Sequence, residues 1–185
     1  MTRAHVLDGR RIDVVARPGV ARLMPAAEVA RVVVAALDAA GAPAVASLSV
    51  ILTDDDELAD LNVAHLGHEG PTDVLSFPLL PRDAFPPHEG ATLPGRGETP
   101  EPPFARPPRA RVHLGDIAVS VERAIAQATE GRGGHTGDRR WAPADELRLL
   151  LTHGVLHVCG WDHAEPVEEA AMRALERRLL GNVGS

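Results

Sequence analysis

Residues 152–165 read THGVLHVCGWDHAE, and they close a helix that the sequence predicts over 143–159. Proline is favoured at the first position of a helix, so Pro143 marks the start. Leu147, Leu150 and Val155 then recur at helical spacing on one side. Gly160 can adopt the left-handed conformation that ends a helix and turns the chain back. The sequence therefore predicts a buried helix followed directly by a tight turn.

Three histidines lie on this helix and its turn. His153 and His157 are four residues apart, so on a helix they lie about 40° apart in projection and one turn apart in height. The turn at Gly160 can deliver His163 as a third ligand. Three protein ligands leave one position for water, which is typical of catalytic zinc sites. A lone histidine pair would also suit a surface or a helix cap, but H-x-x-x-H-x-x-G-x-x-H predicts a site for one zinc ion or another divalent transition metal.

The same histidine spacing is found in metzincin proteases, which carry a glutamate directly after the first histidine as the general base. Gly154 stands at that position here. Because glycine cannot accept a proton, the sequence disfavours a zinc peptidase.

Strands and helices are mixed along the rest of the chain. Strands are expected at 11–16, 46–53, 73–77 and 112–120, where apolar and β-branched residues gather. Helices are expected from Pro25 to Gly41, after an N-cap at Asp54 or Asp55, from Ser120 to about residue 130, and from near Pro166. This pattern predicts an α+β fold with one small mixed sheet packed with helices, in a single domain over 1–185.

Proline is concentrated in one stretch of the chain. Nine of the 16 prolines fall within 80–111, with several glycines among them, which argues against a helix or a central strand there. We expect a mobile surface insertion, with 82–108 dispensable for folding because its composition offers little to bury.

Charge and cysteine content restrict the class of protein. The formal net charge is −7, and all 19 basic residues are arginine, so RNA binding would need a local arginine patch. Cys159 is the single cysteine, which excludes an internal disulfide, gives no reason to expect a disulfide-linked partner and fits a reducing compartment.

The N-terminal stretch lacks the apolar core of a signal peptide, and no run suits a membrane span. We expect a cytoplasmic protein.

Several segments together resemble one family. HGVLHVCGWDH resembles the H-G-x-L-H-L-x-G-Y-D-H signature of the YbeY family of bacterial endoribonucleases. PTDVLSFP (71–78) and LGDIAVS (114–120) resemble its second and third signatures, and TDDDELADLN (53–62) resembles the stretch before the second. The matches follow the family's order from about residue 45 to 181.

The resemblance implies a metal-dependent hydrolase that cleaves single-stranded RNA in ribosomal RNA maturation and ribosome quality control. Its partners would be ribosomal RNA and the ribosome or its assembly factors, and its metal ligands would be His153, His157 and His163. Two alternatives remain. One is a ribosome-associated RNA-binding protein with a structural metal, and the less favoured one is a zinc peptidase.

The chain departs from the family pattern at one position. Many members carry an arginine in L-N-x-x-[YF]-R, thought to meet RNA phosphate, whereas this chain reads LNVAHL with His65 and Leu66 at the last two positions. We expect either that another arginine, for example one near 106–111, makes this contact, or that activity is weaker.

Other polar residues have two interpretations. Asp73 and Ser76 could orient substrate or a ligand histidine, or serve as a turn cap and a sheet hydrogen bond. Asp162 could accept a hydrogen bond from a ligand imidazole, or cap the final helix. Asp116 is expected to be structural, Glu146 a solvated charge and Cys159 a buried core residue rather than a ligand. The remaining histidines are expected at the surface or in loops: His65, His68, His88, His113 and His135.

Overall fold

A five-stranded mixed sheet forms the centre of the structure, a computed structural model that describes all residues except 1, 68–69, 71, 92–109, 131–140 and 182–185. The strands lie in the order β1-β2-β3-β5-β4. Both edge strands run antiparallel to their neighbours, and the three inner strands run parallel to one another. Their bounds are β1 (Thr2–Leu7), β2 (Arg10–Ala16), β3 (Ala46–Thr53), β4 (Val74–Pro78) and β5 (Val112–Ser120).

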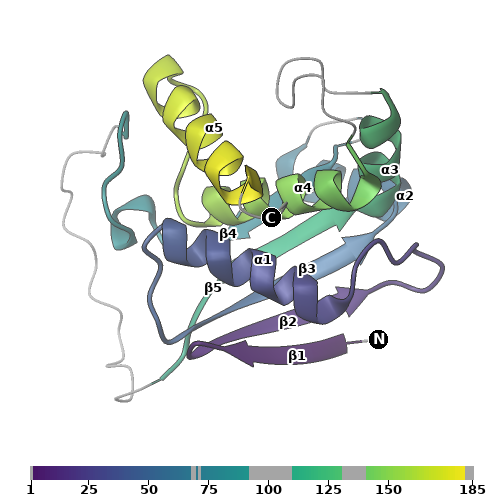
Figure 1. The fold of residues 1–185 in the computed structure, drawn as a ribbon, viewed down its shortest axis with the longest axis horizontal. Helices are drawn as coiled ribbons and strands as arrows, with labels where there is room; N and C mark the ends of the chain where they lie inside the picture. Colours follow the sequence, from purple (N-terminus) through teal and green to yellow (C-terminus); the bar gives the residue numbers. More distant parts are fainter. Residues whose placement is uncertain (1, 68–69, 71, 92–109, 131–140, 182–185) are drawn as a thin grey trace.

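Helices cover the two faces of the sheet unequally. Helices α1 and α4 pack against each other over one face, and α5 packs on α4 (Figure 1). On the other face, α2 covers only one end, where Leu58 packs with Leu75 and Ala118. The arrangement confirms the predicted α+β fold. The bounds are α1 (Ala26–Ala39), α2 (Asp55–Leu66), α3 (Val121–Glu130), α4 (Pro143–Val158) and α5 (Pro166–Gly181), with a 3-10 turn η1 (Arg82–Ala84).

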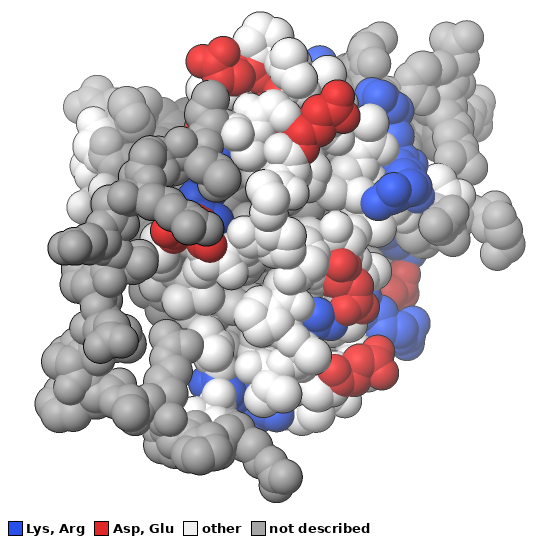
Figure 2. All heavy atoms as spheres, turned by 90° about the vertical axis from the view of Figure 1, so that its left-hand side faces the viewer, with Lys and Arg blue, Asp and Glu red and all other residues white. Residues whose placement is uncertain are grey.

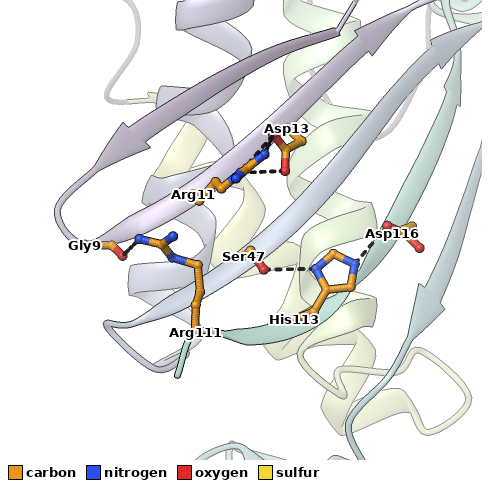
Figure 3. A network of polar contacts seen from close by, with 7 residues as sticks. All are labelled: Gly9, Arg11, Asp13, Ser47, Arg111, His113 and Asp116. Carbon is orange, nitrogen blue, oxygen red and sulfur yellow. Dashed lines mark hydrogen bonds and ion pairs between the residues drawn. The ribbon is translucent and has the colours of Figure 1, made fainter. Parts of the chain in front are cut away.

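The inner strands direct alternate side chains to the two faces. In β3, Leu48 and Val50 are fully buried under the helices, while the residues between them face the other side. On that side Ser47 Oγ lies 3.1 Å from His113 Nδ1, and His113 Nε2 lies 3.1 Å from Asp116 Oδ1 (Figure 3). The structural role expected of Asp116 is thus a contact across this open polar face. None of the helices that the structure describes is long and apolar enough to span a membrane.

Strand β1 was absent from the sequence prediction. It is an edge strand with mostly exposed side chains, so it lacks the alternation that marks a half-buried strand. Asp8 and Gly9 join it to β2 with positive φ angles of 49° and 85°. Asp-Gly is the preferred pair for a two-residue hairpin turn of this kind, so this pair was the available signal.

The helix caps agree with the short polar residues in the sequence. Of the two candidates, Asp54 is the N-cap of α2, where its carboxylate accepts a hydrogen bond from Glu57 N–H at 2.9 Å. Ser120 Oγ accepts from Arg123 N–H at 3.1 Å at the start of α3. Each cap satisfies a backbone donor that the first turn of a helix leaves unpaired.

The first part of the proline-rich stretch packs on the core, which corrects the expected surface insertion over 80–111. Phe85 is only 5% exposed and belongs to the main apolar cluster. Pro86 lies so close to Gly41 that a Cβ there would be 2.7 Å from the proline Cγ. Residues 92–109 lie outside the described part of the chain. The burial of Phe85 therefore places this part of the stretch on the core, although its overall composition predicts a surface insertion.

Candidate metal centre

The predicted turn after α4 has the geometry of a Schellman motif. Gly160 has φ of +83°, Gly160 N–H donates to His157 O at 3.0 Å, and Trp161 N–H donates to Leu156 O at 3.0 Å. These bonds satisfy carbonyl groups at the helix end and reverse the chain within three residues. The reversal brings His163 back beside the last turn of α4.

The three histidines expected as ligands lie together. One potential ligand atom from each of His153, His157 and His163 lies within 4.8 Å of the others. The Nε2 atoms of His153 and His157 are 3.0 Å apart. The ring centroids of His163 lie 5.8 Å from His153 and 5.1 Å from His157. Three imidazoles converging on one point are a donor set that suits zinc, because neutral histidine nitrogen is one of its preferred ligands.

Glu176 of α5 orients the first of these rings. Its carboxylate accepts a hydrogen bond from His153 Nδ1 at 2.8 Å, and its side chain is nearly buried. A carboxylate can only accept, so Nδ1 carries the proton and Nε2 presents its lone pair to the cluster. Such a carboxylate behind a ligand imidazole is the usual means of fixing its tautomer and orientation.

Glu176 is not among the residues predicted from the sequence, although a signal for it is present. Met172, Leu175 and Glu176 are buried on one face of α5, so a carboxylate stands in an apolar stripe. A charge at such a position needs a buried partner.

Burial keeps the middle histidine neutral. Desolvation, together with repulsion from His153 and His163, lowers the pKa of His157 to about 4, against smaller opposing effects of Asp162 and a backbone hydrogen bond at Trp161. A neutral imidazole is the form that binds a metal ion, so protons do not compete at this position near neutral pH.

Gly154 packs closely against the sheet, and it has no side chain that could accept a proton. A Cβ at this position would lie 3.0 Å from Val74 Cγ2 and 3.3 Å from Ile117 Cγ2, so α4 sits tightly on β4 and β5. Ser76 Oγ donates to the Gly154 carbonyl at 3.0 Å and ties the two elements together. A glutamate at this position would require the Val74 and Ile117 side chains to shift.

The two aspartates considered as site residues accept backbone hydrogen bonds. Asp73 Oδ1 accepts from Val74 N–H at 2.9 Å, and Oδ2 accepts from Gln127 Nε2 at 3.0 Å. Asp162 Oδ1 accepts from His163 N–H at 2.7 Å rather than from a ligand ring. Both carboxylates therefore shape turns next to the histidines.

Two cavities open on either side of the histidine cluster. One, of about 210 Å³, lies between α4 and α5 and is lined by His153, His163 and Arg173 among others. The other, of about 570 Å³, runs along β4 and is lined by all three histidines together with Asp73 and Ser76. Both cavities reach the histidine cluster, since Asp73, His153 and His163 line each of them.

One arginine of the stretch 106–111, which was expected to contact RNA phosphate, makes a different contact. Arg111 donates to Gly9 O at 3.4 Å, at the β1–β2 turn and away from the β4 edge (Figure 3). Residues 106–109 lie outside the described part of the chain. Among the described residues that line the two cavities, Arg173 is the one arginine, and its side chain is 47% exposed.

One other prediction, for Glu146, was wrong, while those for His88 and Cys159 agree with the structure. Glu146 is fully buried rather than solvated, because Trp141 covers the first turn of α4 and donates from Nε1 at 2.6 Å. His88 lies in the loop after η1, as expected, and its side chain is largely buried against Trp161. Cys159 is buried as expected, and burial raises the pKa of its thiol to about 12. His68 and His135 lie outside the described residues.

A family model and the curated relatives point to the same family. The family model for endoribonuclease YbeY matches residues 21–184. An endoribonuclease YbeY of Salinispora tropica is 44% identical over 147 residues, which cover 80% of each chain. One of Roseiflexus castenholzii is 37% identical over 174 residues, covering 94% of this chain and 92% of the relative. A solution structure from Thermotoga maritima has a TM-score of 0.49 at 19% identity, covering 93% of this chain and 91% of that chain.

Proposed function

The chain belongs to the endoribonuclease YbeY family, and on that premise we propose that it is a metal-dependent hydrolase that cleaves single-stranded RNA. Its role would be in ribosomal RNA maturation and ribosome quality control in the cytoplasm, together with the ribosome or its assembly factors. The observation that supports this function best is the convergence of His153, His157 and His163 beside two cavities.

These three histidines would hold one zinc ion or another divalent transition metal. The donor set fits, because Glu176 fixes the tautomer of His153 and the low pKa of His157 keeps that ring neutral. A zinc ion held there would polarise a phosphoryl oxygen and make a water molecule nucleophilic near neutral pH.

The protein contributes mainly binding and orientation. No glutamate follows the first ligand histidine, so slow turnover is expected from a site that relies on positioning and on its cation. The face shown in Figure 2 carries acidic and basic side chains interspersed among neutral ones, in keeping with the net charge of −7. This face therefore offers no uniformly basic surface for RNA.

Arg173 is the group that we propose meets the RNA backbone. It projects from α5 into the cavity shared with His153 and His163, and it pairs there with Glu169. A phosphate entering the cavity would exchange this partly exposed pair for a charge-assisted hydrogen bond to the guanidinium. Arg173 would thereby replace the arginine that the family pattern places at the position of Leu66.

The decisive experiment measures metal-dependent cleavage of single-stranded RNA. Wild-type protein should cut it, a chelator should stop the reaction, and unfolded casein should stay intact. His157→Ala should abolish cleavage, whereas His113→Ala, on the open face of the sheet, should retain it. Casein hydrolysis would support a peptidase. RNA binding that survives loss of all three histidines, together with no cleavage by the wild type, would support the structural-metal alternative.

A matched pair of variants tests Arg173. Arg173→Gln should raise KM and reduce the salt dependence of RNA binding, because each phosphate contact on single strands contributes about 0.7 to the slope. Arg177→Gln removes the same charge one helical turn away, outside both cavities, and should leave both quantities unchanged. Equal effects of the two variants would reject the contact.

A further inference from the structure

A buried carboxylate lies next to the turn that carries His163. Glu168, in the first turn of α5, is 1% exposed. It pairs with the Arg82 guanidinium and lies 2.7 Å from His88 Nε2. It also accepts a hydrogen bond from the backbone N–H of Asp162 at 2.8 Å. One side chain therefore joins α5, the segment 82–90 and the residue directly before His163.

The segment 82–90 also contacts the turn and the start of α5 without involving the Glu168 side chain. The His88 ring stacks on Trp161 with centroids 3.9 Å apart and planes 7° apart. A Cβ on Gly160 would lie 2.7 Å from Arg82 Cγ. A Cβ on Gly90 would lie 2.4 Å from the backbone nitrogen of Glu168. The segment thus packs closely over both the turn and the start of α5.

The charge on Glu168 makes this arrangement specific. Burial alone would raise the pKa of Glu168, but hydrogen bonds from Arg82, His88 and Asp162 N–H outweigh it and lower the pKa. Removing one partner of a buried, ionised carboxylate leaves an uncompensated charge and strongly destabilises the protein. The contacts of Glu168 therefore form or break as a set. The backbone of the turn is therefore held from both ends, by the Schellman motif at Gly160 and by Glu168 at Asp162.

We propose that Glu168, Arg82 and His88 form a clamp that positions His163 for metal binding. His163 is exposed. Glu176 supports the ring of His153 and not that of His163. The position of the His163 ring consequently follows the backbone at 160–162. Glu168 is a positioning residue for the third ligand, and the segment 82–90 is part of the metal centre. This inference rests on the proposed metal site.

The test combines Glu168→Gln with a double-mutant cycle. Glu168→Gln should weaken zinc binding about tenfold, the lower end of the range for groups that orient ligands, as measured by competition with a chromophoric chelator. In a His163→Ala background the same change should have no further effect, because Glu168 acts through that ligand. A general loss of stability would instead weaken zinc binding equally in both backgrounds, which would overturn the proposal. Glu165→Gln, exposed just before α5, is the matched control.

Amide hydrogen exchange tests the clamp without metal. In the metal-free protein, Glu168→Gln and His88→Ala should speed exchange of the Asp162 N–H, while amides of the buried strand β5 stay protected. Unchanged Asp162 exchange in both folded variants would overturn the clamp. A wild type that binds no zinc would refute the proposed metal site, while the exchange data would still decide whether Glu168 holds the turn.

Discussion

Replacing Glu176 with glutamine should weaken zinc binding while leaving the fold intact. The side chain keeps its shape and can still accept a hydrogen bond from His153 Nδ1, at 2.8 Å in the wild type, but it loses its charge. A hydrogen bond to a charged partner contributes about 1.5–3 kcal/mol and a neutral one about 1 kcal/mol. The difference matters most when the lone pair of Nε2 on the same ring is shared with a cation. A loss of about 1.4 kcal/mol corresponds to about tenfold weaker zinc binding.

Competition with a chromophoric chelator at neutral pH measures this change directly, and thermal unfolding of the metal-free protein shows whether the variant is folded. Glu165→Gln is the control, since it removes one exposed carboxylate from the same region. A zinc dissociation constant within about twofold of the wild type, in a folded Glu176→Gln protein, would show that the carboxylate does not tune His153.

Three further predictions concern stability and reactivity. Phe85→Ala should destabilise the protein by about 3–5 kcal/mol in urea unfolding, while Leu79→Ala, 61% exposed, should change stability by less than about 0.5 kcal/mol; equal effects would remove Phe85 from the core. Because its pKa is about 12, Cys159 should react with a thiol reagent at pH 8 only as fast as the protein unfolds, so rapid labelling of native protein would contradict its burial. Gly154→Glu should lower the melting temperature strongly without adding peptidase activity, and a stable variant that cleaves casein would refute the packing argument.

The clustering of the three histidines could be predicted because its geometry is local. His153, His157 and His163 lie within eleven residues, and the helix period and the left-handed Gly160 determine how they meet. Strands β2, β3 and β5 could be predicted for a similar reason, since buried β-branched runs mark them.

The supporting residues could not be predicted because their partners are distant in sequence. Glu176 meets His153 across 23 residues, and Glu168 meets Arg82 across 86. Local patterns reveal only that a carboxylate stands in an apolar stripe, without naming its partner. The buried part of the proline-rich stretch was missed for the same reason, because Phe85 and His88 gain their burial from elements elsewhere in the chain.

The place of α5 after the histidines has a consequence for biosynthesis. Translation runs from the N-terminus, so all three imidazoles are made before Glu168 and Glu176 exist. A nascent chain at that stage contains the three histidines but lacks α5. That helix carries Glu176, which fixes the tautomer of His153, and Glu168, which contacts the turn before His163. The site can therefore mature only when α5 has been synthesised and has docked on α4.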